Sequence, residues 1–198
     1  GFRTWSYQSD YCRFRTFELM ADEIRKRRVE GEAAELGVYK GTFSRLINAK
    51  FPDRKLYLFD TFQSFDRDEY AEELERESCG EGFIDVFKDT SVEKVISGMP
   101  CPAQCIPRVG YFPDTAEGME DIRYAFVSID VDFEKSIYEG LKYFYPRLNR
   151  GGAIFVHDYN NYFLHGVKRA VGRYEETIGE PLIRIPIADG GGTLVILK

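Results

Sequence analysis

Long apolar runs and targeting patterns are missing from this chain of 198 residues. No stretch approaches the roughly 20 consecutive apolar residues that a membrane-spanning helix needs. The first residues also lack the basic start, apolar middle and small-residue cleavage site of a signal peptide. We therefore expect no membrane partner and a cytoplasmic location. The chain starts with Gly1, and the sequence leaves open whether the natural start lies further upstream.

Patterned cysteines and clustered basic residues are also scarce. The net charge is -6, and the one short basic run, residues 25–28, is typical of the solvated end of a helix. Nucleic acid is therefore not an expected partner. The chain has four cysteines: Cys12, Cys79, Cys101 and Cys105. They are not spaced like metal ligands, and they are too few for a disulfide framework. We expect them to be reduced thiols.

Helical and strand patterns alternate along the whole chain. The expected strands cover residues 33–37, 55–60, 105–111, 125–130, 153–157, 182–187 and 193–197. The expected helices cover residues 14–24, 41–51, 92–96, 137–144 and 167–178. The glycine-rich residues 189–192 join the last two strands as a hairpin. This order predicts one α/β domain over residues 1–198, with a Rossmann-like, doubly wound, seven-stranded sheet that is mostly parallel and has an antiparallel last strand.

Two segments do not fit a simple strand-helix alternation. Residues 1–30 form an expected N-terminal helical extension, and the polar residues 61–82 are too long and irregular for a plain connector. We interpret residues 61–82 as a partly helical flap. Its aromatic side chains Phe62, Phe65 and Tyr70 either cover a ligand or pack against the protein, and the sequence does not separate these two roles.

The most informative local pattern is Glu35-Leu36-Gly37-Val38-Tyr39-Lys40-Gly41, between an expected strand and an expected helix. A carboxylate ends the strand, and two glycines allow left-handed backbone angles and close approach of a ligand to main-chain N–H groups. The spacing lacks the first close glycine pair of the dinucleotide fingerprint. It therefore favours S-adenosylmethionine over a nicotinamide cofactor, with an ordinary strand-to-helix turn as the alternative.

Acidic side chains follow several of the expected strands. Because ligands of doubly wound sheets lie beyond the carboxyl ends of the strands, these residues are expected to meet at one rim. They comprise five carboxylates and one of the two histidines of the chain: Glu35, Asp60, Asp130, Asp132, His157 and Asp158. Asp60 is placed to accept hydrogen bonds from two ribose hydroxyls, and its alternative role is to cap a turn.

Asp130, His157 and Asp158 are candidate metal ligands, because neighbouring carboxylates repel each other unless a cation or a proton lies between them. Oxygen ligands favour magnesium, calcium or manganese, whereas an imidazole shifts the preference towards manganese or a later transition metal. The alternative is a core histidine beside two loop-capping aspartates. Asp132 is the candidate general base, and His157 competes for that role.

Five motifs together resemble the macrocin O-methyltransferase family of class I S-adenosylmethionine-dependent methyltransferases, from about Phe14 to the end of the chain. They are AELGVYKG (34–41), LYLFDTF (56–62), SIDVD (128–132), YPRL (145–148) and GGAIFVHDY (151–159). The resemblance implies methylation of sugar hydroxyls in natural product biosynthesis. It also implies a magnesium-like ion, with manganese as an alternative, held by Asp130 and the pair at 157 and 158, and Asp132 as the base.

The candidate cofactor-binding residues that follow are Glu35, Gly37, Tyr39, Gly41, Asp60 and Asp130. We expect a small-molecule acceptor, glycosylated or polyol, and leave a homo-oligomer open. The chain departs from the family pattern at His157, where the characterised antibiotic enzymes often have an aspartate, and in its shorter N-terminal region. Two alternatives remain: a metal-independent methyltransferase that uses His157 as base, and a noncatalytic module that binds a nucleoside cofactor.

Overall fold

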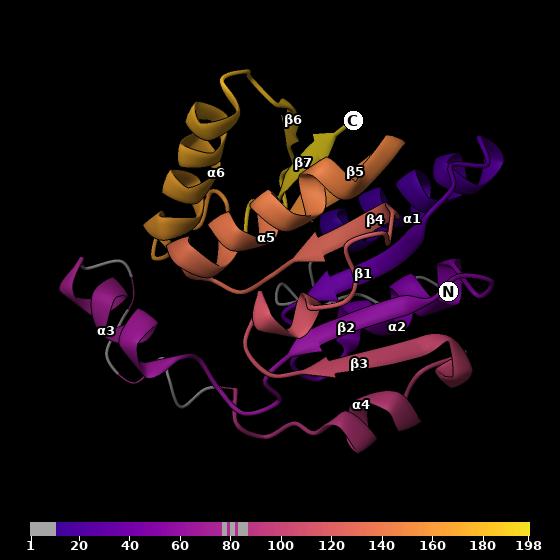
Figure 1. Ribbon diagram of the computed structural model, residues 1–198, viewed down its shortest axis with the longest axis horizontal. Helices are drawn as coiled ribbons and strands as arrows, with labels where there is room; N and C mark the ends of the chain where they lie inside the picture. Colours follow the sequence, from indigo (N-terminus) through magenta and orange to yellow (C-terminus); the bar gives the residue numbers. More distant parts are fainter. Residues whose placement is uncertain (1–10, 77–78, 80–81, 83–86) are drawn as a thin grey trace.

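The computed structural model describes residues 11–76, 79, 82 and 87–198, and within them a seven-stranded sheet has the order β3-β2-β1-β4-β5-β7-β6 (Figure 1). The strands are β1 (Glu32–Leu36), β2 (Leu56–Asp60), β3 (Cys105–Val109), β4 (Tyr124–Ile129), β5 (Leu148–Val156), β6 (Ile183–Pro186) and β7 (Leu194–Leu197). All neighbouring pairs are parallel except those of β7, which runs antiparallel to both β5 and β6. The expected doubly wound α/β fold with an antiparallel last strand is therefore confirmed.

Helices cover both faces of this sheet (Figure 1). They are α1 (Tyr11–Lys26), α2 (Thr42–Lys50), α3 (Arg67–Glu75), α4 (Val92–Ser97), α5 (Glu134–Arg147) and α6 (His165–Ile178), with two short 3-10 helices, η2 (Pro102–Gln104) and η3 (Asp114–Ala116). Side chains of α5 and α6 join one apolar cluster, and those of α1, α2 and α4 join the other. Successive residues of β4, Phe126 and Val127, belong to opposite clusters, which explains why apolar residues in β4 do not simply alternate with polar ones.

The start of β5 differs most from the sequence prediction, whereas the ends of the other strands lie within two residues of the predicted ones. The strand expected at 153–157 begins at Leu148, because Leu148 pairs with Tyr124 and Ala153 pairs with Phe126, so that residues 149–152 oppose Ala125 alone. The two glycines expected to precede the strand lie inside this bulge. A Cβ on Gly152 would approach the Ala125 carbonyl oxygen to 2.7 Å, so glycine permits the close contact between β4 and β5.

The remaining predictions concern the flap and the thiols. Helix α3 confirms that the 61–82 segment is partly helical, while residues 77–78 and 80–81 of that segment lie outside the described part. In Figure 1, α3 lies at the carboxyl end of the sheet, beside the first turns of α5 and α6.

All four cysteines are free. Among the described residues, no helix has both the length and the apolar character needed to cross a membrane.

Candidate functional site

The strand order reverses between β1 and β4, and a cavity of about 950 Å³ opens at the carboxyl ends of β1, β2, β4 and β5. Its wall contains eight of the nine residues singled out from the sequence: Glu35, Gly37, Tyr39, Asp60, Asp130, Asp132, His157 and Asp158. Gly41 is the residue that does not line the cavity. A Cβ on Gly41 would meet Val95 Cγ1 at 2.9 Å, so this glycine lets α4 pack closely against the start of α2.

The glycine loop, residues 37–41, joins β1 to α2. Gly37 has φ 87°, and a Cβ there would overlap the carbonyl oxygen of Asp130. Glycine is therefore needed to bring the loop after β1 against the loop after β4, and its role in letting a ligand approach main-chain N–H groups stays a prediction. Tyr39 also has a positive φ of 49°, and its hydroxyl donates to Asp89 at 2.7 Å.

Asp60 holds this loop in place from the end of β2. Its Oδ2 accepts hydrogen bonds from the backbone N–H groups of Val38, at 2.6 Å, and Tyr39, at 2.9 Å. Its Oδ1 accepts from the N–H of Phe62 at 2.6 Å. The carboxylate thus joins the glycine loop to the start of the 61–82 segment, as the turn-capping alternative predicts. A carboxylate has about four acceptor positions, so binding of ribose hydroxyls stays a prediction.

Glu35 lies at the base of the cavity and is 2% exposed. The Ser44 hydroxyl, from α2, donates a hydrogen bond to its carboxyl group. Burial raises the pKa of Glu35 to about 8, although the Ser44 hydrogen bond opposes this shift. At neutral pH the protonated form is therefore favoured, and Glu35 can donate as well as accept a hydrogen bond.

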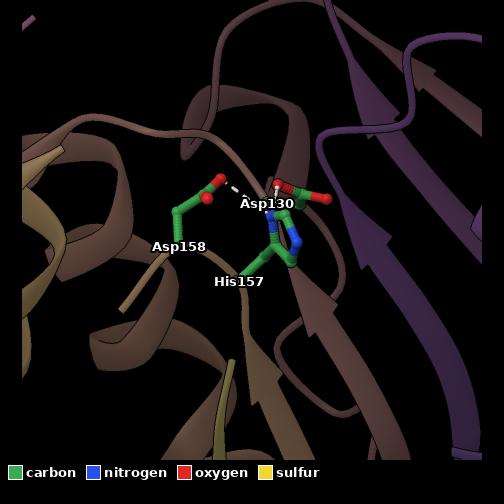
Figure 2. Close-up of side chains that lie close together, drawn as sticks. All are labelled: Asp130, His157 and Asp158. Carbon is green, nitrogen blue, oxygen red and sulfur yellow. Dashed lines mark hydrogen bonds and ion pairs between the residues drawn. The ribbon is translucent and has the colours of Figure 1, made fainter. Parts of the chain in front are cut away.

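The candidate metal ligands converge on one point (Figure 2). One ligand atom from each of Asp130, His157 and Asp158 lies within 4.8 Å of the other two. Nδ1 of His157 is 3.1 Å from Asp130 Oδ1 and 2.8 Å from Asp158 Oδ2. Neighbouring ligands of an octahedral ion with bonds of about 2.1 Å are separated by about 3 Å, so this donor set fits a divalent cation.

Asp132 lies beside this cluster and is 8% exposed. Burial, together with the negative charges of Asp130 and Asp158, raises the pKa of Asp132 well above its usual range. Its backbone has φ 63°, in the left-handed region that few non-glycine residues adopt. A carboxylate with a raised pKa is a stronger base than an ordinary aspartate, which suits proton abstraction.

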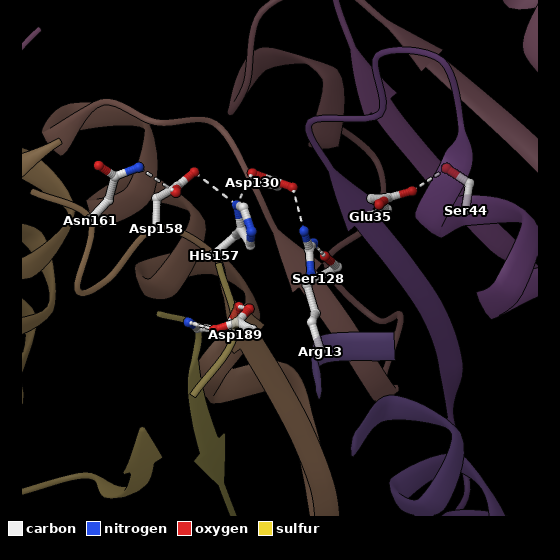
Figure 3. Close-up of polar contacts among 10 residues, drawn as sticks. Arg13, Glu35, Ser44, Ser128, Asp130, His157, Asp158, Asn161 and Asp189 are labelled. Atoms are coloured by element: carbon white, nitrogen blue, oxygen red, sulfur yellow. Dashed lines mark hydrogen bonds and ion pairs between the residues drawn. The ribbon is translucent and has the colours of Figure 1, made fainter. Parts of the chain in front are cut away.

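Arg13, from α1, is a site residue that the sequence did not reveal (Figure 3). It is only 4% exposed, and Nη1 lies 2.9 Å from Asp130 Oδ2 while Nη2 donates to the Ser128 hydroxyl at 3.2 Å. Burial would raise the pKa of Asp130, but His157 and Arg13 outweigh it and hold the pKa well below its usual range. Asp130 is therefore ionised, and Arg13 supplies part of the positive charge that the carboxylates need.

The other side of the cluster is bounded by the loop after β5 and by the hairpin between β6 and β7. Asn161 donates from Nδ2 to Asp158 Oδ1 at 2.7 Å. A Cβ on Gly191 would lie 2.6 Å from His157 Nε2, so the hairpin packs against the back of the imidazole (Figure 3). Asp189 fastens the hairpin by accepting from the Thr193 N–H at 2.6 Å. These contacts leave Nδ1 of His157 facing the two carboxylates.

Several solved structures with the same fold are described as methyltransferases. The O-methyltransferase NovP has a TM-score of 0.75 and 20% identity, covering 94% of this chain and 79% of that chain. CalS11, a calicheamicin methyltransferase, has a TM-score of 0.66 and 17% identity, covering 93% and 79%. TomG from Streptomyces achromogenes, an O-methyltransferase solved with S-adenosylmethionine, has a TM-score of 0.59 and 15% identity, covering 93% and 80%.

These likenesses establish the fold, and the sequence itself carries the family assignment. The comparison with curated proteins gave no match. Residues 10–190 match the family model described as macrocin-O-methyltransferase (TylF), which confirms the resemblance seen in the five motifs. The chain therefore belongs to the macrocin-O-methyltransferase (TylF) family of O-methyltransferases.

Proposed function

We propose that this protein transfers the methyl group of S-adenosylmethionine to a hydroxyl of a sugar or a sugar-containing natural product, with the help of a divalent cation. One observation carries the proposal. Asp130, His157 and Asp158 present converging ligand atoms in the same cavity that the glycine loop and Asp60 line. The cavity thus has room to bring a cofactor, a cation and an acceptor hydroxyl together, and the family assignment supports methyl transfer to oxygen.

The cofactor is proposed to lie against the carboxyl ends of β1 and β2, where Gly37, Tyr39 and Asp60 line the cavity. Solved neighbours support this choice, since TomG was solved with S-adenosylmethionine and an O-methyltransferase from Bacillus cereus with S-adenosylhomocysteine. When bound, S-adenosylmethionine supplies an electrophilic methyl group. Glu35, buried below the loop with a raised pKa, is suited to donate a hydrogen bond to it.

The chemistry on the acceptor side is assigned to the cluster at the ends of β4 and β5. A divalent cation held by Asp130, His157 and Asp158 would stabilise negative charge on an acceptor oxygen. Asp132 accepts the hydroxyl proton, since its pKa is raised by burial and by its acidic neighbours. Alignment of the two reactants can supply about 7–11 kcal/mol of barrier lowering, so a moderate base suffices.

A sugar acceptor is favoured by polar side chains in the cavity wall and by one neighbour. Side chains that can hydrogen-bond to hydroxyl groups line the cavity, including Lys135, Ser136, Glu139 and Asn161. CalS11 has also been described as a TDP-rhamnose 3'-O-methyltransferase in calicheamicin biosynthesis. Its 18% identity to this chain supports a sugar hydroxyl as the class of acceptor and leaves the particular sugar open.

A metal-independent reaction is the second candidate, and Arg13 is the observation that favours it. Its guanidinium already neutralises Asp130, and His157 Nδ1 contacts the carboxylates of Asp130 and Asp158. In this version His157 takes the acceptor proton directly. Activity that survives a chelator would select this second reaction, whereas loss of activity that Mg²⁺ or Mn²⁺ restores would select the metal-assisted one.

Calorimetry with S-adenosylmethionine and S-adenosylhomocysteine, with and without Mg²⁺ and Mn²⁺, tests the proposal. We expect saturable cofactor binding, and methyl transfer to a member of a panel of nucleotide sugars and glycosylated small molecules. Absence of cofactor binding under every condition would refute the enzyme assignment. Cofactor binding without turnover on the panel, together with no effect of cations on binding, would instead favour a noncatalytic binding module.

A further inference from the structure

Helix α3 carries two glutamates that are buried although the helix lies at the edge of the molecule (Figure 1). Glu69 is 7% exposed and Glu73 is 2% exposed. Glu69 Oε1 accepts from the backbone N–H of Ser136 at 2.8 Å, and its Oε2 accepts from the Ser136 hydroxyl at 2.7 Å. Glu73 Oε1 accepts from the backbone N–H of Glu134 at 3.0 Å. Both carboxylates therefore bind the first turn of α5.

These contacts act as an N-terminal cap supplied by another helix. The first N–H groups of a helix have no partner inside it, and negative charge is favourable at that end. Phe133 occupies the N-cap position of α5 and has no polar side-chain atom that could accept from them. A cap of this kind usually comes from the residue just before the helix. Here it comes from side chains more than sixty positions earlier.

The capped turn continues directly into the candidate base. Phe133 donates its N–H to the Val131 carbonyl at 2.7 Å, which closes a tight turn around Asp132. Asp132 has a positive φ in this turn, a conformation that costs about 1–3 kcal/mol for a non-glycine residue unless surrounding contacts impose it. Phe133 is buried, and its ring lies 4.3 Å from that of Phe65 and 6.3 Å from that of Tyr70, both in the 61–82 segment.

The neighbourhood of the two carboxylates is built around them. Arg169, from α6, lies 3.7 Å from Glu73 Oε2 and 2.7 Å from Glu134 Oε2. A Cβ on Gly166 would come within 3.0 Å of Glu73 Oε2, so a glycine leaves the space that the carboxylate fills. A glutamate exposed to solvent needs neither a neighbouring arginine nor space left by a glycine. Helix α3 is therefore fastened to α5 and α6 by specific polar contacts rather than by an apolar face.

We propose that Glu69 and Glu73 are positioning residues that hold the Val131–Phe133 turn, and with it Asp132, in the geometry needed for proton transfer. The catalytic meaning of this inference rests on the proposed function, because it assumes that Asp132 is the base. The mechanical link between α3 and the turn does not depend on that assumption. A result that disproves the link between α3 and the turn can therefore be distinguished from one that disproves the proposed function.

Amide hydrogen exchange detected by NMR tests the link. In Glu69→Ala/Glu73→Ala we expect the amides of Glu134, Ser136 and Phe133 to exchange at least tenfold faster. The amide of Val127, in the centre of β4, should exchange as in the parent protein. Glu69→Gln, which keeps an oxygen acceptor for the Ser136 N–H, should change these rates less than threefold. The matched control is Glu75→Ala, an exposed glutamate on the same helix, which should leave all the rates unchanged.

Two outcomes would overturn the inference. In the first, the amides of Glu134 and Ser136 exchange faster but the amide of Phe133 exchanges as in the parent protein. In the second, exchange of the Val127 amide is accelerated by the same factor as that of the other amides, which would indicate only a loss of overall stability. S-adenosylhomocysteine affinity, measured by calorimetry, should stay within twofold in each variant. If the parent protein does not bind this ligand, the proposed function fails while the exchange result still decides the link. On an acceptor that the parent protein methylates, kcat should fall at least tenfold in the double variant, while KM for S-adenosylmethionine stays unchanged. An unchanged kcat would refute the positioning role.

Discussion

Replacing Arg13 by methionine should destabilise the protein strongly, and a divalent cation should restore part of the lost stability. Methionine keeps most of the apolar stem that packs against Phe43, whose ring lies 4.2 Å from the guanidinium carbon. It removes the charge and both hydrogen bonds, to Asp130 and to Ser128. The ionised Asp130 would then have lost the guanidinium that partly neutralises it.

The expected size of the effect follows from the burial of the ion pair. Removing one partner of a buried pair costs about 3–5 kcal/mol. The Arg13 side chain is 5% exposed but that of Asp130 is 26% exposed, so we expect the lower end, about 3 kcal/mol. For a protein of this length, each kcal/mol shifts Tm by about 2–4 °C, which predicts a fall of about 6–12 °C.

The cation response gives this prediction a second, independent part. At a given concentration, a ligand that binds the folded state more tightly stabilises it more. Mn²⁺ between Asp130, His157 and Asp158 would replace the positive charge lost with Arg13. The rise in Tm on adding Mn²⁺ should therefore be larger for Arg13→Met than for the parent protein.

Thermal and urea denaturation of the metal-free proteins measure the first part, and the same scans with Mn²⁺ measure the second. Arg15→Met is the matched control, because Arg15 lies on the same helix and its side chain is 49% exposed in an ion pair with Glu18. Such a surface pair is screened by solvent and contributes little to stability. Equal losses for Arg13→Met and Arg15→Met would refute the role of the buried pair. Equal Mn²⁺ responses in the parent protein and Arg13→Met would refute the charge argument.

Three further predictions concern the rest of the cavity. Burial gives Glu35 a folded-state pKa of about 8, above its unfolded value, so its contribution to stability is lost as pH rises from about 4.5 to about 8. The free energy of unfolding should fall by about 1 kcal/mol per pH unit over this range. Urea denaturation should show that Glu35→Gln lacks this slope. Gly37→Ala should lower the free energy of unfolding by at least about 3 kcal/mol, whereas Gly172→Ala, in open space on α6, should not destabilise. Asp132→Asn should abolish methyl transfer while calorimetry finds S-adenosylhomocysteine affinity unchanged; loss of both would point to a different role for Asp132.

The layout of the sheet could be predicted from the sequence because the central strands carry their own signal. Largely apolar runs such as residues 125–129, interrupted only by Ser128 and followed by an acid, indicate a parallel strand buried on both faces with its carboxyl end at the ligand-binding edge. That rule alone predicts that Asp130, His157 and Asp158 lie close together, and the structure places their ligand atoms within 4.8 Å of one another.

The contacts that the sequence did not reveal depend on residues far apart in the chain. Arg13 lies 117 positions before Asp130, and helical spacing places it only near the apolar face of α1. The one sequence signal for its role is that Arg13 adjoins the apolar face of α1, where a charged side chain is unexpected. The glutamates of α3 look like ordinary solvated helix residues, since nothing local indicates that the first turn of α5 needs their carboxylates. Gly41 lies close to Val95 of α4, and the sequence pattern does not distinguish a glycine needed for such packing from a ligand-binding one, so its role in cofactor binding stays a prediction.

Titration of Mn²⁺ into the protein saturated with S-adenosylhomocysteine, followed by calorimetry and electron paramagnetic resonance, is the most direct test of the site. We predict one saturable Mn²⁺ site in the parent protein and at least about tenfold weaker binding in Asp158→Asn, with the affinity for S-adenosylhomocysteine unchanged. Absence of Mn²⁺ binding in the parent protein, or equal binding in Asp158→Asn, would contradict a cation site built from Asp130, His157 and Asp158.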